Sequence, residues 1–283
     1  MLYGEIRPRS LADLANIFCP PQLRMRALSV ACLAIILPAV LFSSHAAAQD
    51  SFEVQVYESD LVPSGHFELD VHTLFVGRGN TTWDGTVAPS NQQFHVALEF
   101  TRGVTDAFEL GSYLLLARLP DGSSHYAGFR LRPRLRAPED WHLPVGVSLS
   151  VEVGFPQLVY EPNHVSLEFR PIIDKRIGRW IFDINPVVTF AFNGPDAGQG
   201  MALEPEAKIG YDIIVDRLMC EMEYFTALGP AHKLFPLAEQ VHLLYPKLEY
   251  TITPAFVVNA GVGFGLTGAS DRLTWAARFT FNL

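Results

Sequence analysis

Cysteine and long apolar runs are both scarce in this 283-residue sequence. Of its three cysteines, Cys19 and Cys32 lie in an N-terminal stretch that we expect to be removed, which leaves Cys220 alone and excludes an internal disulfide. The longest apolar run, Ala27 to Phe42, has about 16 residues and contains Pro38. It is shorter than the roughly 20 residues that a membrane-spanning helix needs.

That run has the features of a secretory signal peptide. Arg24 and Arg26 flank a possible start at Met25, and small residues follow the apolar core in "HAAAQ". A basic start, a short apolar core and a small-residue site predict export, with cleavage after Ala48. Residues 1–48 are therefore assigned to a leader, and either Met1 or Met25 can be the true start.

Positive charge is also in short supply. Without the four Lys/Arg and two Asp/Glu of residues 1–48, the chain keeps 17 basic and 28 acidic residues, a net charge of −11. Such acidity argues against binding to nucleic acid. No low-complexity linker or block of charge divides the 235 residues from 49 onward, so we expect one domain.

No part of the exported chain shows a sustained 3.6-residue apolar period, whereas period-two alternation recurs along its length. This alternation predicts β-strands. The twelve predicted strands cover residues 65–78, 92–102, 107–118, 124–136, 145–155, 164–174, 178–193, 200–213, 216–228, 240–252, 254–266 and 271–283.

The connections between these strands alternate between mostly short and generally longer segments. "GVTD", "DKRIG" and "TP" are short, while "GNTTWDGTVAPSNQ" and "ALGPAHKLFPLAE" are long and rich in Gly, Pro and Asp. An even number of strands joined in this way is typical of outer-membrane barrels. We predict an all-β fold, a transmembrane antiparallel up-and-down β-barrel of about 12 strands over residues 65–283, with residues 49–64 as a periplasmic segment.

The two faces of the predicted strands differ as lipid and a wet interior require. One parity is apolar, for example Phe94, Val96, Leu98 and Phe100 in the second strand. The other parity carries the charge, with Glu68, Asp70, Glu99, Glu109, Glu152, Glu168, Arg170, Asp183, Glu204, Glu206, Lys208, Glu221, Glu223, Lys247, Glu249 and Arg278.

The last predicted strand, "RLTWAARFTFNL", alternates up to residue 283. A soluble β-sandwich, the alternative fold with alternating strands, needs no such aromatic final strand. In a barrel this strand pairs with the first one. Phe279, Phe281 and Leu283 also resemble the C-terminal signal that bacterial outer-membrane proteins present to the barrel-assembly machinery. Outer-membrane lipid is the second expected partner.

Several segments in order resemble a family of bacterial outer-membrane barrels named for the MetA pathway of phenol degradation. The matching stretches are "VYESDLVPSGHFELDVHT", "KRIGRWIFDINPVVTFAF", "LEPEAKIGYDI", "LGPAHKLFPLAEQVHLLYPKLEY" and "GVGFGLTGASDRLTWAARF". The resemblance spans nearly the whole exported chain. It implies a barrel of about twelve strands and transport of small solutes, with aromatic or hydrophobic compounds as the expected class.

Four arginines form a row in "GFRLRPRLRA". Arg130, Arg132, Arg134 and Arg136 share one face of the fourth predicted strand, spaced about 6.6–6.8 Å apart because alternate residues share a face. One interpretation is a track for anionic or polar solutes. The alternative is pairing with acidic residues of neighbouring strands, for which Glu109, Glu152 and Glu168 are candidates.

Other clusters give weaker signals. His66, Glu68, Asp70 and His72 share one face of the first strand, where His95 and Glu99 of the second can oppose them. A cation site or a pH-sensitive pair is one interpretation, but residues two apart in a strand diverge too far for one ion to collect all four. We expect ordinary interior polarity and no metal site.

Catalytic and cofactor motifs find little support. "GSSHYAG" offers Ser123, Ser124 and His125 for a hydrolase, but neighbouring residues do not form a triad, in which a separately placed base meets the nucleophile. No helix follows the glycines of "NAGVGFGLTG", so a dinucleotide site is not expected either. We predict no catalytic residue and no cofactor.

The prolines within predicted strands are unexpected. Pro133, Pro171, Pro186, Pro205 and Pro246 all have the outward parity. A closed barrel has no free edge, so each proline removes a ladder hydrogen bond and predicts a bulge or kink.

The sequence leaves two main functional hypotheses from different classes. The first is an outer-membrane channel that passes or binds a small solute along its charged interior. The second is a closed structural or adhesion barrel, because wide interiors are expected only with more strands. A hydrolase is a third and weaker hypothesis.

Overall fold

The structure of the protein, a computed structural model, describes residues 52–83 and 85–283. The predicted signal peptide and its cleavage site lie outside the described residues, so they stay predictions. Within the described part, the only regular helix is the 3-10 turn η2, Glu139–Trp141. No helix of that part is long and apolar enough to cross a membrane.

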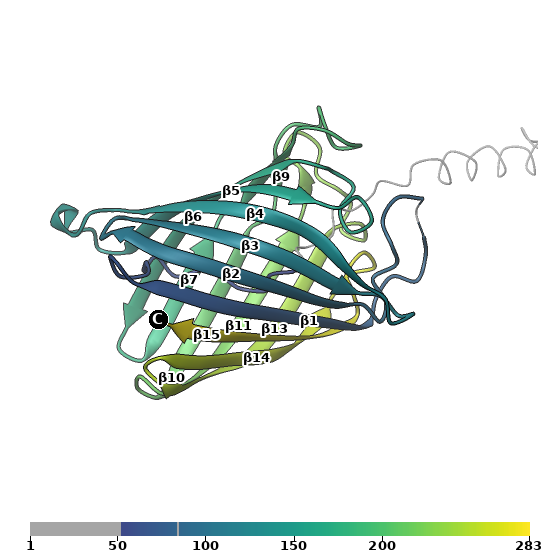
Figure 1. Ribbon diagram of the computed structural model, residues 1–283. Helices are drawn as coiled ribbons and strands as arrows, with labels where there is room; N and C mark the ends of the chain where they lie inside the picture. The colour runs from purple at the N-terminus through teal and green to yellow at the C-terminus, as the bar shows by residue number, and fades with distance from the viewer. Residues whose placement is uncertain (1–51, 84) are drawn as a thin grey trace, which may run out of the picture. The chain divides into compact units, whose positions relative to one another are not determined.

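The described chain forms one antiparallel sheet of fifteen strand segments (Figure 1). The segments are β1 Phe67–Arg78, β2 Phe94–Thr105, β3 Phe108–Arg118, β4 Ser124–Arg136, β5 Gly146–Pro156, β6 Ser166–Ile177, β7 Trp180–Asn185, β8 Val188–Ala191, β9 Ala202–Leu203, β10 Glu206–Ile214, β11 Leu218–Ala227, β12 Gly229–Pro230, β13 Val241–Thr253, β14 Phe256–Gly265 and β15 Leu273–Asn282.

These segments make twelve spanning strands in a closed barrel. The pairs β7 and β8, β9 and β10, and β11 and β12 each continue one strand across a short interruption. The strand β7 pairs with both β6 and β10, and β1 pairs with both β2 and β15, so the sheet closes on itself. The predicted fold class, an all-β barrel of about 12 strands, is confirmed.

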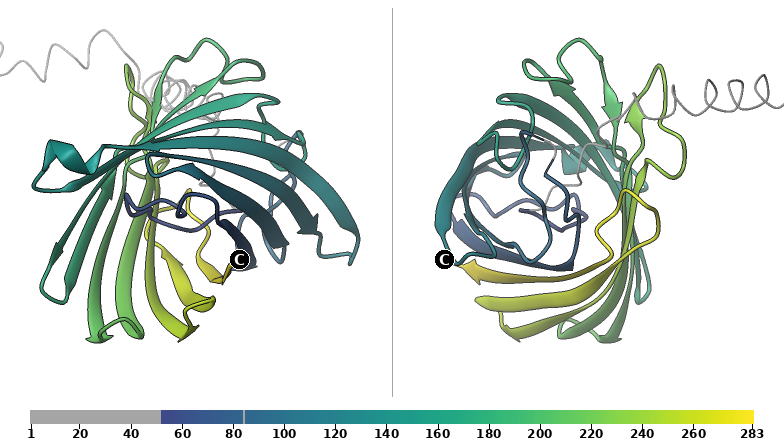
Figure 2. Two further views of the ribbon diagram at one scale, coloured as in Figure 1. Left: turned by 60° about the vertical axis from the view of Figure 1, so that its left-hand side comes forward. Right: turned by 90° about the vertical axis from the view of Figure 1, so that its right-hand side faces the viewer.

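Closure uses the final strand as the sequence predicts. In the register of β1 with β15, Leu69 lies opposite Phe281 and Val71 opposite Phe279. The carbonyl of Phe67 also accepts a hydrogen bond from Leu283 N at 2.8 Å. The alternation of the last twelve residues therefore continues the wall to the seam, where the end of the chain lies beside the start of β1 (Figure 2).

The two strand faces have the expected chemistry. Outward residues such as Phe100, Trp180 and Ile184 are exposed on the barrel surface, where an outer-membrane barrel meets lipid. Inward charged residues such as Glu99 and Arg132 are buried in the interior. This division follows from the period of two along each strand.

The strand prolines act in two different ways. Pro186 separates β7 from β8, and Pro205 separates β9 from β10. At Pro133, Pro171 and Pro246 the strand continues, but its ladder with the following strand skips the proline and at least one neighbour. The predicted kinks thus occur as breaks or local ladder gaps at all five prolines, since proline has no N–H to donate.

The chain before β1 runs inside the barrel (Figure 2, dark purple trace). We call residues 52–64 the luminal segment, because their hydrogen bonds reach inward-facing residues of β3, β6, β7 and β11. From the sequence, residues 49–64 were expected to form a periplasmic segment that precedes the barrel. Residues 52–64 lie within the barrel, since the segment's backbone groups find their partners on the inner wall.

Gly103 of β2 allows this segment to leave the interior. A Cβ at this position would lie 2.2 Å from the carbonyl oxygens of both Val62 and Pro63, which are backbone atoms with little freedom to move. Gly65, at a φ of 83°, then turns the chain, and its N–H donates to the Gly103 carbonyl at 2.8 Å. A residue without a side chain is needed for this close approach.

Candidate functional site in the barrel lumen

The arginine row of β4 faces the interior and is paired with carboxylates of the adjacent strands. Arg134 Nε lies 2.9 Å from Glu109 Oε1, and Arg130 Nη1 lies 3.3 Å from Glu152 Oε1. Pairing with both of these acids was one of the two interpretations of the sequence. The row is therefore charge-compensated along its edges.

Arg132 occupies the middle of the row and is the most enclosed of the four arginines. Its Nη2 contacts the Glu99 carboxylate and lies 3.5 Å from Glu109 Oε1. The other oxygen of Glu99 lies 3.2 Å from His72 Nε2. These four side chains come from β1, β2, β3 and β4, and the pairing of each of these strands with the next brings them together.

A second cationic centre lies on β6. Arg170 Nε is 2.7 Å from Glu168 Oε1, and its Nη1 is 2.6 Å from Glu206 Oε2. Glu168 was considered as a partner of the arginine row, but Arg170 holds it instead. Arg136, at the end of the row, lies 3.0 Å from Asp60 of the luminal segment in a largely exposed pair.

The remaining candidate residues contact other groups. Thr280 donates to Asp70, Arg278 Nη2 lies 3.1 Å from Glu249 Oε2, and Thr189 donates to Glu204 at 3.1 Å. Glu68 pairs in register with residues of β2 and β15 at the seam. These remaining candidate residues face the interior on parts of the wall away from the arginine row of β4.

The luminal segment is fixed by its backbone. Tyr57 N donates to Asn185 Oδ1 at 2.8 Å, and Asn185 Nδ2 donates to the Tyr57 carbonyl at 3.0 Å. Val62 N donates to Glu109 at 2.7 Å, and Lys247 Nζ donates to the Val54 carbonyl at 2.6 Å. Wall side chains thus take the place of a neighbouring strand and satisfy the buried peptide groups of the segment.

Acidic side chains of the segment add ion pairs. Glu58 Oε1 lies 2.6 Å from Lys208 Nζ of β10. The Lys208 ammonium lowers the pKa of the Glu58 carboxyl below its ordinary value, against the opposing effect of burial. Glu53 lies 3.9 Å from Arg130. The segment therefore contributes negative charge at the points where the wall presents cations.

The aromatic ring of Tyr57 is enclosed by guanidinium groups. The central guanidinium carbons of Arg132, Arg134 and Arg170 lie 4.7, 5.3 and 5.2 Å from its ring centroid. The phenol oxygen lies 2.9 Å from Tyr113 Oη and donates to Glu53. Burial raises the pKa of the Tyr57 phenol, so the hydroxyl stays protonated. We call this group of side chains around the ring the Tyr57 cage.

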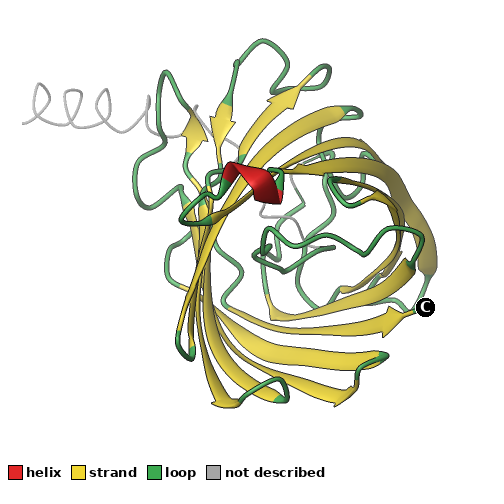
Figure 3. Cartoon of the chain, turned by 90° about the vertical axis from the view of Figure 1, so that its left-hand side faces the viewer, coloured by secondary structure: helices red, strands yellow, loops and turns green. Residues whose placement is uncertain are grey.

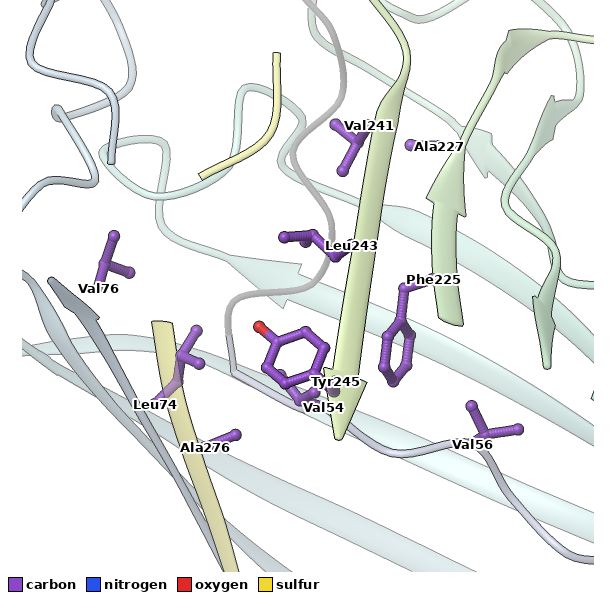
Figure 4. Close-up of a cluster of buried hydrophobic side chains, with 10 residues drawn as sticks. All are labelled: Val54, Val56, Leu74, Val76, Phe225, Ala227, Val241, Leu243, Tyr245 and Ala276. Atoms are coloured by element: carbon purple, nitrogen blue, oxygen red, sulfur yellow. The ribbon is translucent and has the colours of Figure 1, made fainter. Parts of the chain in front are cut away.

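The opposite side of the segment is apolar (Figure 4). Val54 and Val56 belong to a buried cluster with inward residues of four strands. Its other members are Leu74, Val76, Phe225, Ala227, Val241, Leu243, Tyr245 and Ala276. The sequence analysis assigned the charged residues to a wet interior. These residues show that part of the inner wall is apolar and packs against the segment.

One group in the described residues has the geometry of a metal site. Ligand atoms of Glu53, His72 and Glu99 all lie within 4.8 Å of one another. The Glu99 carboxylate, however, already contacts the Arg132 guanidinium, and Glu53 accepts from Tyr57. The cationic neighbours compensate the charge that would attract a metal ion, so this group acts as a hydrogen-bonded ion network.

The serines and histidine considered for hydrolysis lie at an exposed position, where the loop before β4 passes into the first residues of that strand. Ser123 Oγ lies 2.6 Å from Asp121 Oδ1 and 2.8 Å from His125 Nε2. In a catalytic triad the histidine stands between acid and nucleophile, whereas here the serine stands between the other two. Hydrogen bonds from Ser123 also lower the pKa of the Asp121 carboxyl. The arrangement is that of a capped turn.

The residues that fix the luminal segment to the wall were not predicted from the sequence. Tyr57, Asn185 and the two valines of the segment were not among the candidates. One signal was available, since residues 52–57 read Phe-Glu-Val-Gln-Val-Tyr and alternate like a strand. Asn185 has no comparable signal, because its role depends on where the segment lies.

Comparison with solved structures shows the same fold. The COG4313 outer membrane channel from Pseudomonas putida F1 superposes with a TM-score of 0.54 at 11% identity, over 82% of this chain and 100% of that one. The NanC porin gives 0.52 at 11% identity, over 76% and 100%. The KdgM porin, solved in complex with disordered oligogalacturonate, gives 0.50 at 9% identity, over 76% and 99%.

No family model matches the chain, and no curated protein matches it. The likeness to these structures therefore shows the fold, a closed barrel of the bacterial outer-membrane type. The class of solute has to be inferred from the residues of this chain.

Proposed function

We propose that the protein is an outer-membrane channel for small solutes, that its path is closed by the luminal segment, and that its solutes carry an aromatic ring. The fold is that of known outer-membrane channels. An interior lined by ionised side chains is typical of such barrels. The luminal segment lies in that interior, and wall side chains surround its Tyr57 ring as they would surround a bound ligand.

The Tyr57 cage carries the proposal about the solute. The edges of the Arg132, Arg134 and Arg170 guanidiniums are engaged by wall carboxylates. Their central carbons lie 4.7 to 5.3 Å from the centroid of the tyrosine ring. Because wall carboxylates already pair with each guanidinium, the contact left for a solute is the cation–π contact that the Tyr57 ring makes, rather than a salt bridge with an anion.

In such a channel, we do not expect the arginine row to act as a track for anionic solutes. A track for anions needs cations whose charge is available to the solute. Here the wall holds Glu99, Glu109 and Glu152 beside the row, and the net charge of the chain is negative. The expected solutes are therefore neutral or weakly charged aromatic compounds, the class that the family resemblance also implies.

Single-channel recording in planar bilayers tests the proposal, with Tyr57→Ala as the main variant. Removing the ring empties the cage and weakens the hold of the segment, so the variant should be open for longer than the unaltered protein. Added p-cresol, which reproduces the tyrosine side chain, should reduce the current through the variant. The control compound, 4-methylcyclohexanol, has a similar size and no π-face and should reduce it less.

Each result decides between the functional hypotheses. Silence of both proteins would favour the closed structural or adhesion barrel, whose motivation is the dense ion pairing of the wall. Equal open times would show that the segment is not the gate. Equal block by the two compounds would remove the aromatic class while leaving the channel intact.

A further inference from the structure

The outward, lipid-facing side of the barrel wall has a hollow that is separate from the lumen. On the outward face of β10, β11, β13 and β14 lies a groove with a volume of about 850 Å³. This is within the range of about 300–1,000 Å³ that ligand pockets occupy. Its lining is almost entirely apolar and includes Ile209, Met222 and Leu248.

The register of the strands explains the hollow. Tyr211 lies opposite Cys220, Cys220 opposite Leu248, and Leu248 opposite Ala260, so these four residues form one row across the wall. Outward residues in one row stand side by side. Cys220 and Ala260 are small, whereas Tyr211 and its neighbour Trp180 are large and rise at one side of the groove.

A cation lies just beyond the lining of this groove, next to the row that Cys220, Leu248 and Ala260 form. Tyr250 lies two residues beyond Leu248 on β13 and so has the same outward face. Arg217, in the turn before β11, donates to the Tyr250 hydroxyl from Nη2 at 3.0 Å and from Nε at 3.2 Å. Its guanidinium carbon is 5.7 Å from the Tyr250 ring centroid. Both residues are exposed, and Asp216 is the acidic neighbour in the same turn.

The position of Arg217 along the membrane normal follows from the connections. The turn that contains it has three residues between β10 and β11, and it lies at the end of the barrel where Leu283 meets β1 (Figure 1), which is the end that faces the viewer in Figure 3. Short turns mark the periplasmic end of outer-membrane barrels, and aromatic residues mark the membrane interface. Tyr211, Tyr250 and Trp180 place Arg217 at the level of the inner-leaflet headgroups.

We propose that the groove and Arg217 bind one glycerophospholipid of the periplasmic leaflet, with an acyl chain in the groove and the phosphate on the guanidinium. Arginine presents several N–H donors, of which those on Nε and Nη2 donate to the Tyr250 hydroxyl and hold the guanidinium at the outer surface, where its other N–H groups can meet a phosphate. An apolar groove with a cation just beyond its lining complements a molecule with an apolar chain and an anionic head. The site is independent of the solute path, since its residues face outward.

Native mass spectrometry of the purified full chain with phosphatidylglycerol tests this site. One lipid per barrel should saturate first and remain bound longest. Arg217→Gln should reduce its occupancy about tenfold, as expected for the loss of one charge-assisted contact. Ala260→Leu, which fills the groove without changing charge, should reduce it as well. Diacylglycerol, which lacks the phosphate, should bind more weakly to the unaltered protein.

Arg102→Gln is the matched control. Arg102 is also exposed on the outward face near this end, and its guanidinium lies 4.9 Å from the Phe67 ring centroid, but it belongs to β2, a strand that contributes no residue to the groove. Equal losses in Arg102→Gln and Arg217→Gln would overturn the proposal, as would many lipids without a distinct first site. Stronger competition by lipid A would overturn the assignment to the periplasmic leaflet. Heat-modifiable migration on gels would establish that each variant is folded.

Discussion

Two walls of the same lumen hold the luminal segment by different physics. On one wall, residues of β2 to β6 surround Glu53 and Tyr57 with arginines and carboxylates. On the other, inward residues of β1, β11, β13 and β15 pack against Val54 and Val56. The segment can contact both because alternate side chains of an extended chain point in opposite directions.

The two walls differ in what they contribute, since one mainly attracts the segment and the other mainly positions it. Burial of a valine stabilises by about 1.5–3 kcal/mol and has no preferred direction. A typical hydrogen bond contributes a net of about 0.5–1.5 kcal/mol but requires a particular geometry. The apolar wall therefore supplies much of the attraction, and the charged wall determines the register at which the segment stops.

The largest effect is expected from breaking the charged wall at Arg132. The Arg132→Ala variant leaves Glu99 and Glu109 buried without their shared cation, at a cost of about 3–5 kcal/mol in the free energy of unfolding. Urea unfolding of the protein in lipid vesicles measures it. Arg136→Ala is the control, because its pair with the exposed Asp60 is worth about 0–1 kcal/mol. Equal losses in the two variants would contradict this ranking.

Breaking the apolar wall should release the segment and leave the barrel intact. Val56→Asp loses about 1.5–3 kcal/mol of apolar burial and adds a carboxyl beside Glu223, which already accepts from Val56 N at 3.2 Å. Hydrogen exchange of the backbone amides of residues 52–64 should become faster, whereas exchange in the strands should not change. Ser64→Asp, at the exposed end of the segment, should leave both unchanged.

A smaller change should result from removing the amide that clamps Tyr57. The Asn185→Ala variant leaves the N–H and C=O of Tyr57 without this partner and should weaken the hold on the segment by about 1–3 kcal/mol. Exchange at the Tyr57 amide measures the change. Asn163→Ala, which removes an amide bonded to Asp196 in a loop, is the control. An unchanged rate at Tyr57 would show that other contacts determine its position.

The smallest effect concerns pH. Because Lys208 lowers the pKa of Glu58 in the folded protein, this pair stabilises the segment above the ordinary pKa of the carboxyl. That contribution is lost as pH falls through the lowered pKa. The open time of the proposed channel should therefore rise in acid, and Glu58→Gln should remove part of this dependence. Asp60→Asn, in an exposed pair, should remove little; a reversed order would contradict the assignment to Glu58.

The barrel itself could be predicted because its signals are local. Alternation in a stretch such as residues 94–101 determines which side chains face lipid, and the last twelve residues show the same pattern up to the seam. The pairing of Glu109 and Glu152 with the arginine row could also be anticipated, since these acids lie on the strands adjacent to β4.

By itself, the amino-acid sequence determined the strand count, the two faces and the residue types of the interior. Only the tertiary structure decided that residues 52–64 lie inside and that Tyr57 fills the space between Arg132, Arg134 and Arg170. The physical reason is the range of the interactions. A strand's faces follow from the spacing of its own residues, whereas the cage joins β4, β6 and the segment, which become neighbours only when the sheet closes around them.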